Sequence, residues 1–243
     1  MKFILAKKME MTQKFAPDGA VIPVTKVIAG PCVVVQIKTE KNDGYSAVQL
    51  GFGLKKSKNI NKPQTGHLKK LGNFRYLREF RIPEAEAAKL ALGSKITSQV
   101  FQSGDMVKVT GLSKGKGFQG VVRRHGFHGS PATHGHKDQL RMPGSIGAGG
   151  NQHVLKGRRM PGQMGDSQVT VLNLEVVEIN PENNEIFVKG ALPGARNNLL
   201  LLAGDGEIVI ETEAPAMTAE KAEESMLNDD KKTLEHENIK TNH

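Results

Sequence analysis

The sequence contains a single cysteine, Cys32, which excludes an internal disulfide and favours a reducing compartment. It has no tryptophan and only two tyrosines, too few for a row of aromatic platforms that stack single-stranded bases. No apolar run approaches the roughly 18 residues that a membrane span requires. Only four apolar residues separate Lys2 from Lys7, too short a run for a signal-peptide core. We therefore expect a cytoplasmic protein without a membrane partner.

Signals of catalysis are also scarce. The stretch GKGFQGVV at 115–122 fits the glycine pattern of nucleotide-binding loops, but a Rossmann loop opens a helix, and VVRRHGF instead predicts a strand ended by Gly126. No Walker P-loop occurs, and no serine elbow, H-E-x-x-H or paired-carboxylate pattern occurs in residues 114–165. Cys32 lies in the apolar run PCVVV, which predicts an inert buried thiol. We expect no enzyme, no cofactor and no small-molecule substrate.

Charge is plentiful but unevenly distributed. The chain has 34 Lys and Arg against 25 Asp and Glu, a net of +9. From position 207 onward there are ten acidic and four basic residues, so residues 1–206 carry a net of +15. A basic body with an acidic tail favours a polyanionic partner for the body. A merely soluble basic protein is the alternative interpretation.

Strand patterns dominate the chain outside one long interruption. Residues 55–93 are basic and polar, with one short helix predicted from Pro83 to Gly93. We expect a β domain whose first part, 1–113, contains this basic and helical insertion, and whose closing strands lie within 166–206. The acidic tail, 207–243, is expected to be flexible, with one helix in TAEKAEESML. Segments rich in Val and Ile predict strands within 21–54, 95–101, 106–112, 168–179 and 185–192.

Residues 114–165 form an excursion between two strand zones. Gly and Pro supply 16 of its 52 residues, a share typical of segments that build no core of their own. It holds nine Lys and Arg and a single acid, Asp138. Glycines beside Lys114 and Lys116 can bring backbone N–H groups close to a phosphate. Its net charge is +8, and its cationic side chains would repel one another. We therefore expect an anionic partner that neutralises them.

Residues 125–136 of the excursion, HGFHGSPATHGH, contain four histidines, at 125, 128, 134 and 136, which leave two interpretations open. A zinc site would normally use a mixed Cys and His ligand set, and Arg123, Arg124 and Lys137 would surround this all-His set with like charge. Imidazoles among basic side chains more often donate to phosphate or 2′-hydroxyl groups, or stack on a base. The pattern favours RNA, and metal binding is the minority interpretation.

RNA is also favoured over DNA. The excursion is too irregular to enter a DNA major groove as a helix or ribbon, and no DNA-binding motif is present. Its small residues and scattered cations suit a segment that threads between helices of folded RNA and contacts phosphate and sugar.

Several ordered motifs resemble those of one family. SKGKGFQGVVRRHGF, PATHG, RMPGSIG and LKGRRMPGQMG resemble the excursion of bacterial-type ribosomal protein L-three of the large subunit, a universal family. AKKMEMTQKF and DGAVIPVTKVIAGPC resemble its opening, while NDGYSAVQLGFG and VKGALPGARNNLLLL resemble its later strands and close. The resemblance covers residues 1–203, and so many motifs in one order are more specific than any one alone.

The resemblance implies a mainly β fold: a translation-factor-like β-barrel with a long irregular Gly-, Arg- and Lys-rich extension, a small helical insertion and a C-terminal tail. It implies a non-catalytic constituent of the large ribosomal subunit that binds 23S-type RNA near its 3′ portion and nucleates early assembly. The extension would point toward the peptidyl-transferase region, and proteins L-fourteen and L-nineteen would be neighbours. Gly144, Ser145 and Gly147 would form a tight turn at the tip. Other RNA contacts carried over by position are Lys7, Lys8, Lys114, Lys116, Arg123, Arg124, His125, His134, Arg141, Lys156, Arg158 and Arg159.

Some positions depart from the family pattern. AGGNQHVLKG is one residue shorter than the matching stretch of many bacterial members, and Gln152 does not align with a glutamine that some members carry methylated. We therefore assign no modification to it. His128 and His136 match no family position, and the acidic tail exceeds the family's usual end. An independent RNA-binding module and a His-rich metal-binding protein stay open as alternatives.

Overall fold

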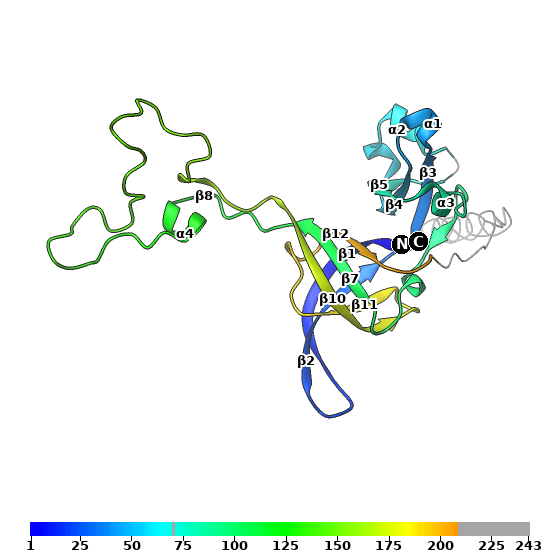
Figure 1. Cartoon of the computed structure of the whole chain (residues 1–243). Coiled ribbons are helices and arrows are strands. Elements are labelled where there is room, and N and C mark those ends of the chain that lie inside the picture. The colour runs from blue at the N-terminus through cyan, green and yellow to red at the C-terminus, as the bar shows by residue number, and fades with distance from the viewer. Residues whose placement is uncertain (70, 209–243) are drawn as a thin grey trace, which may run out of the picture. The chain divides into compact units, whose positions relative to one another are not determined.

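The computed structural model describes residues 1–69 and 71–208 (Figure 1). Strands dominate this part of the chain and form one barrel, one open sheet and one short ladder. The predicted acidic tail lies outside the described residues from position 209 onward, and so does its predicted helix. Within 1–69 and 71–208, no helix is long and apolar enough to cross a membrane.

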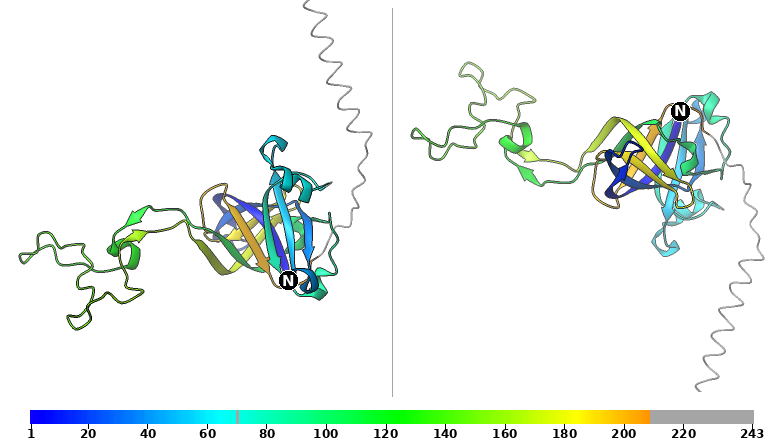
Figure 2. Two further views of the ribbon diagram at one scale, coloured as in Figure 1. Left: turned by 90° about the horizontal axis from the view of Figure 1, so that it is seen from above. Right: turned by 90° about the horizontal axis from the view of Figure 1, so that it is seen from below.

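Six antiparallel strands close into a barrel in the order β1, β12, β7, β10, β11, β2. Figure 2 gives two further views of the same ribbon. Each strand has a hydrogen-bonded neighbour on both sides, so the barrel exposes no strand edge. The predicted mainly β fold with a barrel is confirmed. The barrel strands are β1 Lys2–Phe15, β2 Val21–Ala29, β7 Met106–Leu112, β10 Gln168–Asn180, β11 Glu185–Lys189 and β12 Leu199–Gly204.

The first strand is one of the elements that the sequence patterns did not predict. Phe3, Ile4, Leu5 and Ala6 are all fully buried in succession, so both faces of β1 are covered at this point. A strand buried on both faces shows a continuous apolar run rather than alternation, and periodicity alone does not distinguish such a short run from a segment of a buried helix. Phe3 stacks on Phe80 of the second sheet with ring centroids 4.7 Å apart.

The second sheet has the strand order β5, β4, β3, β6. Residues 32–54, assigned from the sequence to the first part of the β domain, therefore pair outside the barrel, and the predicted insertion at 55–93 contains a strand as well as helices. Gly30 redirects the chain between β2 and β3. Its φ of +79° and the 2.9 Å from an added Cβ to the Ile96 carbonyl both require glycine. The strands are β3 Cys32–Lys38, β4 Ala47–Leu54, β5 Phe74–Arg81 and β6 Lys95–Ile96.

Short helices complete this half of the chain. The helix predicted between Pro83 and Gly93 forms only as a single turn, α3, which ends at Ala87. Gly93 has a positive φ of +84° but does not end the helix, and its N–H donates to the Val34 carbonyl over 2.9 Å. The strand predicted at 95–101 is limited to β6, because a 3-10 turn follows it. The short helices are α1 Glu40–Asp43, α2 Lys62–His67 and α3 Glu84–Ala87, and the 3-10 turns are η1 Ser57–Asn59 and η2 Ser98–Val100.

One continuous apolar cluster joins the barrel to the second sheet. It includes Ile4 and Leu200 of the barrel together with Leu50 and Ile96 of the sheet, all fully buried. Cys32 belongs to this cluster, and its thiol donates to the Leu5 carbonyl over 3.4 Å. Burial raises the pKa of Cys32 to about 12, so the thiol is inert at neutral pH, as the apolar run around it predicted.

The excursion adds only small elements to this framework. Strands β8 Phe118–Gln119 and β9 Gly162–Gln163 pair with each other, and helix α4 spans Val121–His125. Val121 is the only buried residue among residues 114–165, all of which the structure describes. The excursion therefore contributes almost nothing to the apolar core.

We expect the barrel to fold without the excursion. Replacing residues 119–163 by a short glycine linker removes one buried side chain, so the free energy of unfolding should change by less than about 2 kcal/mol. Chemical denaturation followed by far-UV circular dichroism would measure this. Loss of a cooperative transition would show that the excursion is needed for the fold.

Candidate nucleic-acid interface

The excursion leaves the barrel through a paired neck. The last register pair between β7 and β10 joins Leu112 to Gln168, and the Ser113 N–H then donates to the Ser167 carbonyl over 2.9 Å. The ladder of β8 and β9 follows a few residues further on, so the outgoing and returning segments run antiparallel (Figure 1). The barrel thus fixes where both ends of the excursion start.

Helix α4 lies directly beyond this neck, where the sequence predicted a strand. That prediction for VVRRHGF is wrong because contacts distant in sequence decide the local structure. Val121 is buried, Arg124 donates to the Met160 carbonyl over 2.7 Å, and His125 Nε2 lies 3.0 Å from the same oxygen. Gly126, with φ +72°, ends the helix as predicted for a boundary at this position.

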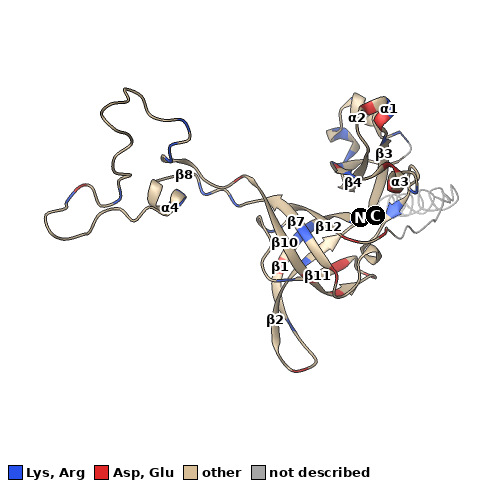
Figure 3. Cartoon of the chain, viewed as in Figure 1, with Lys and Arg blue, Asp and Glu red and all other residues tan. Residues whose placement is uncertain are grey.

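Charge pairing differs between the barrel and the excursion. None of the nine Lys and Arg side chains of 114–165 forms an ion pair with any residue in the described part of the chain. Figure 3 shows these cations distributed along the excursion. Ion pairs on and around the barrel, with N···O distances of 2.6–3.1 Å, join Lys2 to Asp105, Lys14 to Glu178, Lys26 to Glu185, Lys189 to Glu175 and Arg196 to Glu10.

Three predicted contact residues meet at the base of the neck. Lys8, Lys114 and Lys116 line a cavity of about 520 Å³ there. The Lys8 ammonium donates to the carbonyls of Leu192 and Gly194 over 2.7 and 2.9 Å, which holds it in place. Burial and the nearby charge of Lys114 lower the pKa of Lys8 below its ordinary value. An anion at this point would relieve the repulsion between the two ammonium groups.

A second group of predicted residues forms a turn. The Ser145 hydroxyl donates to the Gly147 carbonyl over 2.8 Å, and Gly144 adopts a φ of +77°. The Arg158 guanidinium donates to the Ser145 carbonyl and so ties the turn to the returning segment. These three residues and Arg158 therefore have structural contacts within the excursion itself.

The histidines do not converge. In the described residues, no three or more His, Cys, Asp or Glu side chains gather as a metal-binding group. His125 contacts the Met160 carbonyl, His134 lies in the left-handed region with φ +59°, and His128 lines a cavity that His125 also lines. The opening stretch thus lacks the ligand geometry that zinc requires.

The predicted set is only partly joined by contacts. Arg123, Arg124 and His125 share helix α4, and Arg159 lies over the Phe127 ring at 5.1 Å. Among described residues, no hydrogen bond or ion pair links the side chains of Lys7, His134, Arg141 or Lys156 to these groups.

Sequence reasoning missed two residues of this surface. Lys137 is an exposed cation of the excursion, and Phe127 is one of only two aromatic residues among its 52. The rarity of aromatics in this segment was the signal that could have identified Phe127.

Comparisons with known proteins agree with the resemblance noted in the sequence. The family described as Ribosomal protein L3 matches residues 84–186. Three similar proteins are each named Large ribosomal subunit protein uL3. The protein of Carboxydothermus hydrogenoformans is 50% identical over 203 residues, covering 83% of this chain and 96% of the relative. That of Desulfitobacterium hafniense is 50% identical with coverages of 83% and 94%, and that of Syntrophotalea carbinolica is 52% identical with coverages of 83% and 96%.

Neighbouring arginines of α4 should respond differently to substitution. Arg124→Gln removes the bond to Met160 and should speed backbone amide exchange in α4 several-fold, whereas Arg123→Gln should leave this exchange unchanged. Arg123 is exposed, with one contact to Gln119. Hydrogen exchange measured by mass spectrometry on both full-length variants provides the comparison. Equal exchange in the two would contradict the anchoring role of Arg124.

We expect the purified, untagged chain to hold well under one equivalent of zinc by elemental analysis. A chelator should leave the unfolding midpoint unchanged, because the described residues contain no cluster of three or more His, Cys, Asp or Glu side chains that could hold an ion. Stoichiometric zinc that disappears when His128 and His136 are both replaced by alanine would restore the metal interpretation.

Proposed function

This chain belongs to the ribosomal protein L3 family, and on that premise we propose that its excursion binds the RNA of the large ribosomal subunit directly. As a family member it is a structural component of the large subunit, located on the ribosome, and not an enzyme. The remaining question is which part of the chain contacts RNA, and how.

The observation that carries the proposal is the contrast in charge pairing. The barrel neutralises many of its cations with its own carboxylates, while the excursion leaves nine without an ionic partner in the described chain. Phosphate groups neutralise such cations and release bound counterions, which favours binding. The excursion also has no apolar core of its own that could offset the repulsion between its cations. Folded RNA supplies what the excursion needs: phosphates that neutralise its cations, and a surface against which its residues can pack.

Different residues would contact RNA in different ways. Lys8, Lys114 and Lys116 form a cationic base that suits one or more phosphates, and glycines nearby allow close backbone approach. Ser145 and Gly147 shape a compact turn. We assign direct RNA contact to Lys7, Lys8, Lys114, Lys116, Arg123, Arg124, His125, His134, Arg141, Gly144, Ser145, Gly147, Lys156, Arg158 and Arg159.

The finer parts of the proposal follow the family resemblance. The excursion would penetrate the RNA interior toward the peptidyl-transferase region, while the barrel would stay at the subunit surface. Binding near the 3′ portion of the large-subunit RNA would nucleate early assembly, and proteins L-fourteen and L-nineteen would be neighbours. The narrow paired neck supports this arrangement, because two adjacent segments fit between RNA helices that a barrel cannot enter.

Sedimentation of cell extract in a sucrose gradient tests the assignment to the ribosome. The full-length chain should migrate with large subunits, and the chain that lacks residues 119–163 should remain near the top of the gradient. A full-length chain found mainly as a free, low-mass species would contradict the proposal and favour an independent RNA-binding module.

Salt dependence tests the electrostatic mechanism. With about six to ten phosphate contacts, affinity for large-subunit RNA should fall roughly a thousandfold or more between 50 and 200 mM salt. Replacing Lys114 and Lys116 by glutamine should reduce the slope by about 2, because two phosphate contacts are lost. Lys189→Gln is the matched control, since Lys189 is paired with Glu175 on the barrel. A slope equally reduced in the control would contradict the assignment to the neck.

A further inference from the structure

The excursion holds a cavity of about 430 Å³ next to the end of α4. Its volume falls within the range of small-molecule sites in proteins. The neck lysines do not line it, and it is separate from the ion pairs of the barrel. Phosphate contact by cations alone does not explain why a segment without a core should contain such a hollow.

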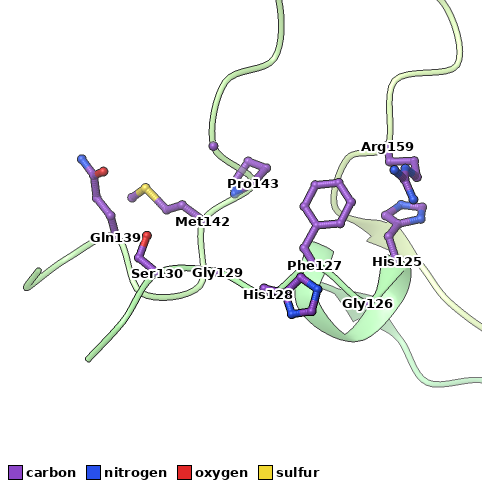
Figure 4. A pocket seen from close by; sticks show the side chains of 11 residues that line it. His125, Gly126, Phe127, His128, Gly129, Ser130, Gln139, Met142, Pro143 and Arg159 are labelled. Atoms are coloured by element: carbon purple, nitrogen blue, oxygen red, sulfur yellow. The ribbon is translucent and has the colours of Figure 1, made fainter. Parts of the chain in front are cut away.

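One wall of the cavity is aromatic and cationic. Phe127 is half-buried, the Arg159 guanidinium lies 5.1 Å from the centre of its ring, and the His125 ring lies 6.1 Å away, tilted by 46°. His125 is fixed in turn by its 3.0 Å contact to the Met160 carbonyl. Figure 4 shows the three side chains grouped at the end of the α4 helix.

The other wall combines polar and apolar side chains. Ser130, Gln139, Met142 and Pro143 lie together on the side away from His125 and Arg159 (Figure 4). The Ser130 N–H donates to the Leu140 carbonyl over 3.0 Å, which closes this part of the loop.

Gly129 is required for that closure. Its φ is +74°, and an added Cβ would overlap the Leu140 carbonyl oxygen. The wall is thus held by backbone contacts, independently of any ligand.

We propose that this cavity receives one unstacked base of the RNA, an inference that rests on the proposed function. The Phe127 ring and the planar guanidinium of Arg159 provide stacking surfaces for a base. Ser130 and Gln139 provide a hydroxyl and a carboxamide for the polar edge of the base or a 2′-hydroxyl. The cavity also gives His128, which matches no family motif, a place beside the bound nucleotide.

A base fits this cavity better than a backbone phosphate does. Arg159 is positioned over an aromatic face, where stacking engages its plane, and no lysine lines the cavity. Val121 is the only buried residue of the excursion, so its own core leaves the Phe127 ring only half-covered. A flat, aromatic and hydrogen-bonding ligand satisfies both walls at once.

The test compares two leucine substitutions in the full-length chain. Phe127→Leu removes the aromatic surface of the cavity, and Phe118→Leu is the matched control, because Phe118 is 76% exposed on β8 and does not line the cavity. Phe127→Leu should weaken binding to large-subunit RNA about fivefold or more, as expected for the loss of one stacked base. Phe118→Leu should change affinity by less than about twofold. The salt slope should be the same in both variants, because no phosphate contact is lost.

Base-specific chemical probing identifies the ligand directly. One unpaired nucleotide should be protected by the unmodified chain and by Phe118→Leu, and should become reactive with Phe127→Leu and with Arg159→Ala. Cooperative unfolding of the barrel, measured on each variant, shows that the fold is intact.

Three outcomes would overturn the inference. Equal affinities for the two leucine variants would remove the stacking role while leaving phosphate binding intact. A cross-link from the cavity to a ribosomal protein instead of RNA would identify a peptide as the occupant. Salt-independent binding by the unmodified chain would overturn the proposed function, and this inference with it.

Discussion

The pairing of β7 with β10 inside a closed barrel is the constraint on which the rest of the structure depends. Because every barrel strand is paired on both sides, the two strands that lead into the excursion cannot separate without opening the barrel. Their last register pair, Leu112 with Gln168, therefore fixes both ends of a segment that has almost no buried side chains. The excursion can have an irregular path because the two barrel strands from which it starts are held in a fixed register.

Ion pairing also differs between the barrel and the excursion. Surface ion pairs on the barrel contribute little each, roughly 0–1 kcal/mol, but they leave few barrel cations available to a polyanion. In the excursion, Asp138 is the single acid among 52 residues, so the excursion cannot neutralise its nine cations with its own carboxylates. The barrel and the second sheet thus hold nearly all of the buried core, while the excursion holds nine cations that have no ionic partner among the described residues.

The sequence predicted the elements whose patterns are local. Alternation in 168–179 and Val-rich runs in 21–29 and 106–112 correspond to β10, β2 and β7. It did not predict β1, because a strand covered on both faces lacks alternation, and it did not separate β3 and β4 from the barrel, because pairing partners are not encoded locally. Helix α4 was missed for a related reason: its contacts with Met160 come from 35 and 36 residues away.

The amino-acid composition predicted where the candidate site lies in the sequence, but not how its side chains are arranged. Cations and glycines identified residues 114–165, but composition could not show that Arg124 and Arg158 are engaged with backbone carbonyls while Lys114 is not held in this way. Nor could it place Phe127 beside Arg159, since these residues meet only when the outgoing and returning segments lie together. Whether a side chain is free to contact RNA depends on its tertiary contacts. Family motifs specify which residue stands at a position, but they do not specify those contacts.

The paired neck has a consequence for how such chains vary in length. Residues added or removed beyond Phe118 and Gln163 leave the register of every barrel strand unchanged, because the ladder is complete before the irregular part begins. Loop-closure entropy grows only slowly with length, by about 0.6 kcal/mol for each doubling. Insertions and deletions in this segment therefore cost the fold little, and the limits on its size are set by the space that surrounds it.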